Sequence, residues 1–230
     1  TSGTVQDSWA TAAVSSTNRN VGGLVGEVGS SGEVVYSRAY GDVEGHKLVG
    51  GLVGRNSGEI RRSWAHGDAT GDPGGDSTYA GDKANRIGGL VGEQNGKGSA
   101  KGIIKNSYAR GDASGESETG GLVGTARDDS LTEDSYSTGS FSVSDNWGGY
   151  SVGLALRSPN GRTYFEAPYR LMSGIGYVHN GNDIYAQSVR SYYMTGENAE
   201  SGMPTLDFDN VWRTTDDYPT LRKPYMNEPQ

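Results

Sequence analysis

Hydrophobic residues occur along this chain in short groups, separated by glycine and polar positions. Pairs such as Leu24-Val25 and Leu52-Val53 favour strands and are too short for one face of an amphipathic helix. The sequence Val-Gly-Gly-Leu-Val-Gly at 21–26 returns at 49–54, closely at 87–92, and as Gly-Gly-Leu-Val-Gly at 120–124. The pattern therefore predicts short strands that recur at a regular interval.

A second motif, Ser-x-Ala-x-Gly-Asp, alternates with the first. It occupies 37–42, 63–68 and 107–112, with a weaker copy at 135–141 and a partial one at 8–10. The two motifs together divide the chain into half-coils of about 14 residues, so that one coil has about 28, with insertions near 70–86 and 95–102. We predict an all-β, right-handed β-solenoid in which equivalent residues stack at about 4.8 Å. The glycines would supply bends with positive φ and close approach between coils.

The repeat weakens toward the C-terminus. We expect a regular solenoid over 1–150, degenerate coils over 151–201 and a capping segment over 202–230 that seals the end of the core. A poor copy of the first motif is found at 153–156, and another at 176–179.

Composition and charge narrow the classes of partner. The chain carries a net charge of −8 and has no Cys. Nucleic-acid binding is disfavoured because phosphates require clustered Lys and Arg, and the longest basic runs are pairs such as Arg61-Arg62. No apolar run approaches the roughly 20 residues of a membrane-spanning helix.

At this point the repeats resemble those of GLUG-motif proteins, named for a Gly-Leu-hydrophobic-Gly core. The resemblance covers roughly 9–221, and the closing Leu206-Asp207-Phe208 with Trp212 and Tyr218-Pro219 resembles the usual end of such arrays. It implies a bacterial or archaeal surface or secreted protein, adhesin-like in character; from the repeat itself we expect a secreted protein or one on a cell or virion surface. Immunoglobulin A peptidases occur in this group, but no zinc-protease segment is found here. The copies are poor over 157–187.

Acidic residues form a candidate metal site. Asp42, Asp68 and Asp112 share one repeat position and could form a column, which Ser140 interrupts. Stacked carboxylates need a cation or hydrogen-bond donors between them; the preferred interpretation is that each Asp accepts backbone N–H groups of its own turn. A possible calcium loop comprises four residues: Asp68, Asp72, Asp76 and Asp82. The sequence requires no cofactor, and a flexible surface loop explains the same residues.

An aromatic column follows the repeat Ser. Its members are Trp9, Trp64, Tyr108, Tyr136 and Tyr192, with Arg38 interrupting it. If the column faces inward it belongs to the core, which is the preferred interpretation; if it faces outward it suits stacking on sugar rings. The candidate ligand-binding residues are Trp64, Tyr108, Tyr136, Tyr164, Tyr169 and Tyr192.

These observations favour a binding or structural role over catalysis. We expect an extracellular adhesion or spacer module whose partner is a glycan or a surface protein. Two alternatives stay open: a carbohydrate-active lyase or hydrolase, for which 128–134 supplies carboxylates, and a self-assembling surface or filament subunit.

Overall fold

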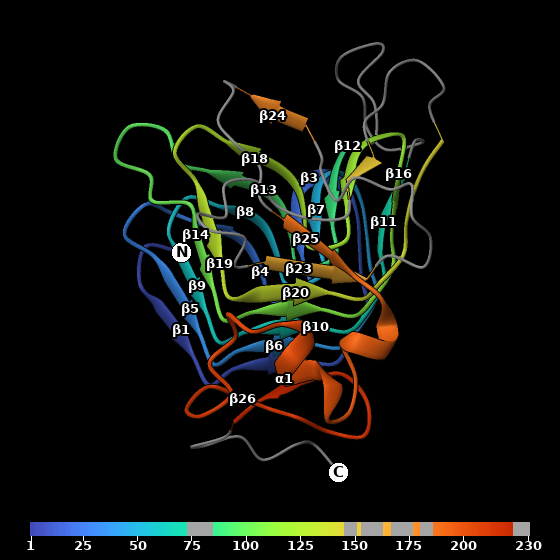
Figure 1. The fold of residues 1–230 in the computed structure, drawn as a ribbon. Helices are drawn as coiled ribbons and strands as arrows, with labels where there is room; N and C mark the ends of the chain where they lie inside the picture. Colours follow the sequence, from blue (N-terminus) through green and yellow to red (C-terminus); the bar gives the residue numbers. More distant parts are fainter. Residues whose placement is uncertain (73–84, 145–150, 153–162, 167–176, 180–185, 223–230) are drawn as a thin grey trace.

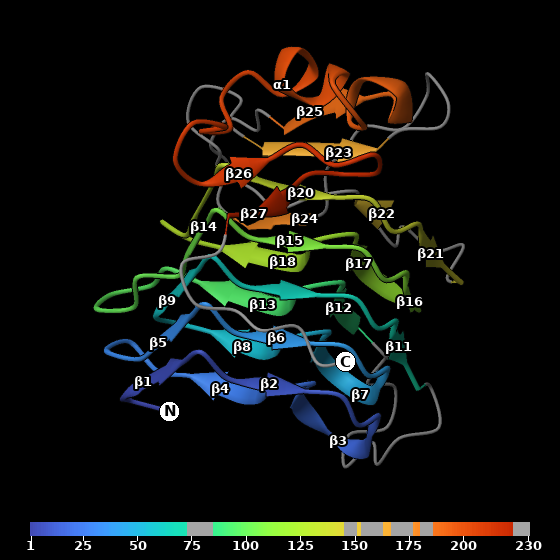
Figure 2. The same ribbon diagram turned by 90° about the horizontal axis from the view of Figure 1, so that it is seen from below.

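The chain winds through four parallel sheets, each of which receives strands from successive turns (Figure 1). The computed structural model describes residues 1–72, 85–144, 151–152, 163–166, 177–179 and 186–222. The fold is a parallel β-solenoid of about four turns of roughly 29 residues, which confirms the predicted fold class. In Figure 2 the turns lie one above another from the N-terminal coil upward.

Two of the sheets are built from short strands. Sheet A contains β1 (Thr4–Gln6), β5 (Glu33–Val35), β9 (Glu59–Arg61), β14 (Ile103–Lys105) and β19 (Leu131–Glu133). Sheet B contains β2 (Trp9–Ala10), β6 (Arg38–Ala39), β10 (Trp64–Ala65), β15 (Tyr108–Ala109), β20 (Ser135–Ser137), β23 (Thr163–Glu166) and β25 (Ala186–Val189).

The other two sheets hold the longer strands and the Gly-Leu-Val-Gly motif. Sheet C contains β3 (Val14–Gly22), β7 (Val43–Gly50), β11 (Ala69–Gly71), β12 (Asn85–Gly88), β16 (Ala113–Gly115), β17 (Ser117–Gly120), β21 (Phe141–Val143) and β22 (Ser151–Val152). Sheet D contains β4 (Val25–Val28), β8 (Val53–Asn56), β13 (Val91–Asn95), β18 (Val123–Arg127) and β24 (Tyr177–His179). The larger predicted insertion falls between β11 and β12.

Equivalent repeat residues pair directly. Val49 of β7 lies opposite Val21 and Ile87, and Val53 of β8 lies opposite Val25 and Val91. The unequal intervals between motif copies are absorbed in three places: the bulge in β3, the break between β11 and β12 within sheet C, and the turn between β13 and β14.

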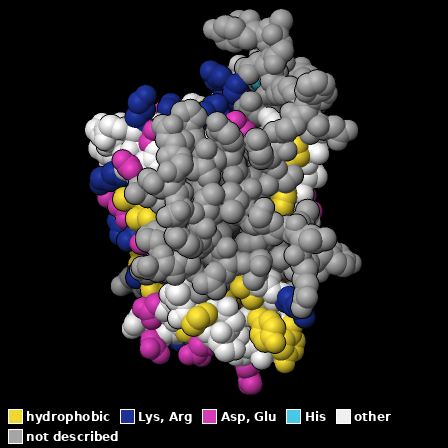
Figure 3. Space-filling view, turned by 45° about the horizontal axis from the view of Figure 1, so that its top comes forward, with side chains coloured by type: hydrophobic (Ala, Val, Ile, Leu, Met, Phe, Trp, Pro, Cys, Tyr) yellow, Lys and Arg dark blue, Asp and Glu magenta, His cyan; other side chains and the backbone are white. Residues whose placement is uncertain are grey.

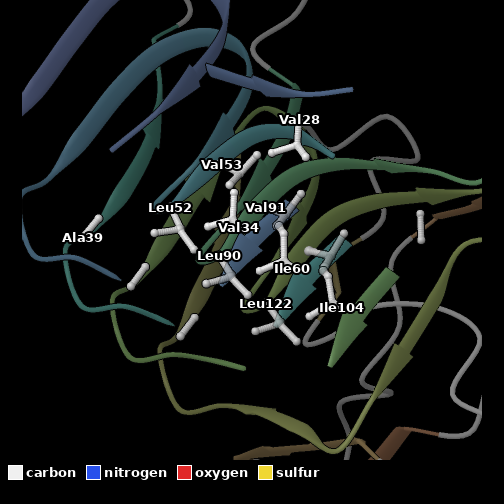
Figure 4. Close-up of a cluster of buried hydrophobic side chains, with 14 residues drawn as sticks. Val28, Val34, Ala39, Leu52, Val53, Ile60, Leu90, Val91, Ile104 and Leu122 are labelled. Carbon is white, nitrogen blue, oxygen red and sulfur yellow. The ribbon is translucent and has the colours of Figure 1, made fainter. Parts of the chain in front are cut away.

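The interior core is filled from sheets A, B and D, and the buried residues of sheet C form a separate cluster of Val21, Val43, Val49, Ala69 and Ile87. The interior core contains Leu52, Leu90 and Leu122, which are fully buried and stacked on one another (Figure 4). Val34, Ile60 and Ile104 approach the same core from sheet A, and sheet B contributes Ala39, Ala65 and Ala109. Small side chains suffice on sheet B because its alanines lie close to the motif glycines; a Cβ on Gly51 would lie 2.9 Å from Ala65 Cβ.

The repeat Ser forms a buried ladder at the corner between sheets A and B. The N–H of Ser8, Ser37, Ser63 and Ser107 donates to the Oγ of the next repeat Ser, at 3.2, 3.1, 3.3 and 3.1 Å. Each Oγ in turn donates to the carbonyl two residues earlier, as Ser63 does to Arg61 at 2.9 Å. The ladder satisfies backbone groups that the turn removes from the sheets.

The glycines confirm the expected close approach between coils but are not the main source of positive φ at the corners. The left-handed residues at the corners are mostly not glycine; they include Tyr36 (φ 51°), Arg62 (φ 49°) and Asn106 (φ 49°), each just before the repeat Ser. The motif glycines are needed for close approach instead. A Cβ on Gly51 would lie 2.2 Å from the carbonyl oxygen of Gly89 in the next coil.

The C-terminal elements lie beside sheet B. They are the 3₁₀ helix η2 (Ser191–Tyr193), α1 (Asn198–Gly202) and an antiparallel pair, β26 (Trp212–Arg213) and β27 (Thr220–Leu221). In Figure 2 the pair lies in front of the sheet B strands. We call residues 190–222 the C-terminal strap. In the described part of the chain no helix is long and apolar enough to cross a membrane.

Candidate functional site

A column of stacked planar side chains runs along sheet B. Its members, in coil order, are Trp9, Arg38, Trp64, Tyr108 and Tyr136. We call this set the stacked column. The rings of Trp64 and Tyr108 lie 5.6 Å apart and 6° from parallel, and those of Tyr108 and Tyr136 lie 5.1 Å apart and 1° from parallel.

Arg38 continues the column rather than interrupting it. Its guanidinium carbon lies 5.1 Å from the ring centroid of Trp9 and 5.6 Å from that of Trp64. The Arg38 side chain is almost fully buried between them. A flat, delocalised cation fits a stacking position that an aromatic ring occupies in the other coils.

The stacked column faces outward from the solenoid, yet most of it is buried. Ala39, Ala65 and Ala109, which follow Arg38, Trp64 and Tyr108, belong to the interior core, so alternation along the strand directs the column to the outside. There the C-terminal strap covers it with Met194, Met203, Leu206, Phe208, Val211, Trp212 and Leu221. The preferred expectation of an inward column was wrong in direction; burial was correctly expected for Trp64, Tyr108 and Tyr136 and was wrong for Trp9 and Tyr192.

Trp212 is the centre of this second core. Its ring centroid lies 6.0 Å from that of Tyr108 and 5.4 Å from that of Tyr136, tilted by 53° and 52°. Trp64, Tyr108 and Tyr136 are 6%, 2% and 0% exposed. Three of the predicted ligand-binding residues are therefore covered by the protein's own chain.

Polar contacts hold the strap to the column. Arg110 donates to Asp217 Oδ2 at 3.1 Å and to the Tyr218 carbonyl at 3.0 Å. The Tyr136 hydroxyl donates to the Pro219 carbonyl, and burial raises the pKa of this phenol above its ordinary value of 10.0. The strap is thus fixed by directed bonds as well as by apolar contact.

Tyr192 does not belong to the stacked column. The register of sheet B places Tyr164 opposite Tyr136 and Gln187 opposite Tyr164, whereas Tyr192 lies in η2. Tyr192 is 66% exposed and forms an edge-to-face pair with Tyr193, 48% exposed, at 5.1 Å between centroids. Figure 3 shows hydrophobic side chains gathered at the lower edge of the molecule, where the C-terminal elements lie.

The two remaining candidate residues are Tyr164 and Tyr169. The backbone of Tyr164 continues sheet B in β23, and Tyr169 lies outside the described residues.

The aspartates form a hydrogen-bonded ladder. Asp42 Oδ1 accepts the N–H of Asp68 at 2.9 Å, and Asp68 Oδ1 accepts the N–H of Asp112 at 2.8 Å. Asp112 Oδ1 then accepts both the N–H and the hydroxyl of Ser140, at 2.7 and 3.0 Å. We had expected each carboxylate to accept from its own turn, and this was wrong: each accepts from the next coil. Ser140 completes the ladder.

The proposed calcium loop is only partly within the described structure. Asp68 belongs to the ladder, and the N–H of Asp72 donates to the Gly45 carbonyl at 2.8 Å. Asp76 and Asp82 lie outside the described residues. Within the part that is described, no three His, Asp or Glu side chains come together as a metal site.

Sequence reasoning missed a charged network on sheet D. The Glu93 carboxylate, 5% exposed, contacts Arg55 at 3.2 Å, Arg86 at 3.0 Å and Arg127 at 2.9 Å. Arg86 also pairs with Glu118 at 2.9 Å. The sequence contained an indication of this network: the position after each Gly-Leu-Val-Gly is charged in three successive coils, as Glu27, Arg55 and Glu93, and is Thr125 in the fourth.

Comparison with known proteins gives distant similarities. No family model matches the chain. Over 121 residues, 53% of this chain, the sequence is 29% identical to halomucin of Haloquadratum walsbyi. The aligned part is 1% of the length of halomucin, so the chain corresponds to a very small part of that protein.

A solved structure shares the fold. It is a Bacteroides ovatus protein provisionally assigned as an immunoglobulin A1 protease, with a TM-score of 0.57 and 17% identity. The match covers 95% of this chain and 75% of that one. At this identity the likeness establishes the β-solenoid fold alone, and the GLUG resemblance continues to rest on the repeats themselves.

Proposed function

We propose that this chain is a rigid module of a secreted or surface protein that holds and presents a binding surface, without catalysing a reaction. The distant relatives support that setting. The carboxylates of the Asp ladder and of Glu93 are engaged in bonds that stabilise the stack, which supports a structural use of these acids. The proposed partner is a glycan or a surface protein.

The exposed pair Tyr192–Tyr193 carries the binding part of the proposal. Large aromatic side chains are costly to leave in water, and amphipathic rings in this position suit stacking on the apolar face of a sugar. The pair is attached to the strap, which is itself fixed to sheet B, so the rings are presented on an ordered support.

A glycan array tests the proposal with the intact chain and two variants. Tyr192→Ala/Tyr193→Ala should reduce glycan binding at least about tenfold, because stacking contributes about 1 kcal/mol per ring. The control, Tyr40→Ala, removes a Tyr from the solenoid body and should leave binding unchanged. Equal binding by the intact chain and the double variant would contradict the assignment of the pair.

The predicted insertion offers a second arm of the same experiment. Replacing 73–84 by a short Gly-Ser linker retains β11 and β12 and removes the acidic stretch predicted to contact a ligand or calcium. Loss of binding in this variant alone would move the binding surface from the Tyr pair to the insertion. Incubation of all variants with a polysaccharide panel should release no sugar, and release by the intact chain would overturn the non-catalytic role.

A further inference from the structure

The N-terminal coil leaves the interior core incompletely covered. Val5, Leu24 and Val25 pack against that core but are only partly buried. Their counterparts one coil later, Val34, Leu52 and Val53, are fully buried. The difference arises because coil two has coils on both sides, whereas the N-terminal coil has one neighbouring coil in the described part of the chain.

The strands of this coil also have one free edge each. Among the described residues, β1, β2 and β4 are the last strands of sheets A, B and D, and β3 pairs with β7 alone. Their backbone groups on the outer side are therefore available for another strand. The four edges belong to the same coil, so they face the same end of the solenoid (Figure 2).

The Ser ladder and the stacked column both end at the N-terminal coil, at Ser8 and Trp9. Each repeat Ser from 37 to 135 accepts an N–H from the preceding coil at its Oγ, but no described N–H reaches Ser8 Oγ, which donates to the Gln6 carbonyl. In the stacked column, Trp9 contacts Arg38 on one side and is 54% exposed, against 6% for Trp64.

We propose that the N-terminal coil is a docking face for one further parallel coil of the same repeat class. Such a coil would place a planar side chain over Trp9, donate a Ser N–H to Ser8 Oγ and cover Val5, Leu24 and Val25. The same contacts already join each pair of described coils, so the partner follows from the interface that repeats through the molecule. The inference extends the proposed scaffold role and does not depend on glycan binding.

The bulge in β3 does not oppose this arrangement. Its register against β7 shifts between Ser16 and Arg19, and both flanking parts stay paired. The same sheet already accommodates a break between β11 and β12. A docked coil would therefore need regular pairing at sheets A, B and D and could deviate at sheet C.

The experiment adds a coil to the full chain. A copy of residues 30–55 is placed before Thr1, so that Thr1, Ser2 and Gly3 take the places of Asn56, Ser57 and Gly58 in the following turn. Hydrogen exchange of 4–28 and radical footprinting of Trp9 are compared in the parent, in the extended chain and in a control that carries the same residues in scrambled order. Exchange over 4–28 should slow at least about tenfold, and labelling of Trp9 should fall severalfold, in the extended chain only.

Two results would overturn the proposal. One is an added copy that exchanges as an unfolded segment and leaves 4–28 unchanged. The other is protection of 4–28 in the parent chain at high concentration together with a dimer in light scattering, which would identify a second copy joined through its N-terminal end as the partner. Neither result depends on glycan binding, so failure here is distinguishable from failure of the proposed function.

Discussion

At the scale of single residues, the motif Gly recurs in successive coils, and the neighbouring coil limits the space for a side chain there. Gly51 lies where a coil meets the next one, and a Cβ there would be 2.2 Å from the Gly89 carbonyl oxygen. The obstacle is backbone held by two sheets, so it cannot move aside as a flexible side chain would.

Substitution of Gly51 by Ala should therefore destabilise the fold. We expect a loss of about 3 kcal/mol in the free energy of unfolding, at the upper end of overpacking costs. Chemical denaturation measures it. Gly3→Ala is the matched control, because its Cβ would meet only Thr1 Oγ1 at 3.9 Å. Equal stability of the two variants would show that the coils are not packed as closely as described.

The Ser ladder gives a second prediction at this scale. Ser63→Ala removes the acceptor of the buried Ser37 N–H and should cost about 1–3 kcal/mol, the penalty for an unsatisfied buried donor. Ser30→Ala, on an exposed residue, should be within about 0.5 kcal/mol of the parent in the same denaturation experiment.

Tyr136 makes stability sensitive to alkaline pH. Burial raises the pKa of its phenol in the folded state above 10.0, the value expected for the unfolded chain. The protonated phenol is thus favoured by folding, so its contribution is complete below pH 10 and is lost as pH rises beyond it. Tyr136→Phe should lower the free energy of unfolding at pH 7 by about 1 kcal/mol, because the bond to Pro219 is lost. Above pH 10 the stability of this variant should decrease less steeply than that of the parent. If the free energy of unfolding decreased equally above pH 10 in the parent and the variant, this role of Tyr136 would be excluded.

At the scale of elements, the interior strands were predictable and the cover over them was not. Motif copies such as 21–26 and 49–54 set the register directly, since their residues pair in the sheets. The direction of the stacked column was not readable, because a strand of two residues has too little alternation to distinguish inside from outside. Its cover comes from the strap, whose contacts with Tyr108 and Tyr136 span a large sequence separation. Ser191-Tyr192 imitates the repeat but lies in η2.

The strap and the solenoid have separate cores, which predicts local opening. Trp212→Ala removes the centre of the outer core and should destabilise the strap by about 3–5 kcal/mol. The interior core around Leu52 and Leu90 does not contain Trp212 and should persist. Hydrogen exchange should therefore accelerate over 190–222 while 49–56 stays protected. Acceleration in both regions together would mean that the two cores unfold as one unit.

At the scale of the whole molecule, a network of ion pairs on the outside of sheet D joins successive coils. The sheet D network links Glu27, Arg55, Glu93 and Arg127 across four strands, β4, β8, β13 and β18. Glu93 is its buried centre, and removing its charge leaves three arginines close together.

Glu93→Gln should cost about 3 kcal/mol, in the range for breaking a buried ion pair, and added salt should recover part of the loss. Glu27→Gln, whose carboxylate is 46% exposed, is the control and should cost below about 1 kcal/mol. Thermal denaturation at low and high ionic strength separates the two. A neutral Glu93→Gln variant would show that the network does not hold the coils together.

The central claim is that the stacked column faces outward from the solenoid and is covered by the strap. Nuclear Overhauser contacts from the rings of Tyr108 and Tyr136 test it most directly, in protein labelled at Leu, Val and Ile methyls and at Trp. The account predicts contacts to the Trp212 indole, whose centroid lies 5.4 Å from that of Tyr136, and none to the methyls of Leu90 and Leu122. Contacts to those Leu methyls without contacts to Trp212 would place the column inside the solenoid and contradict the account.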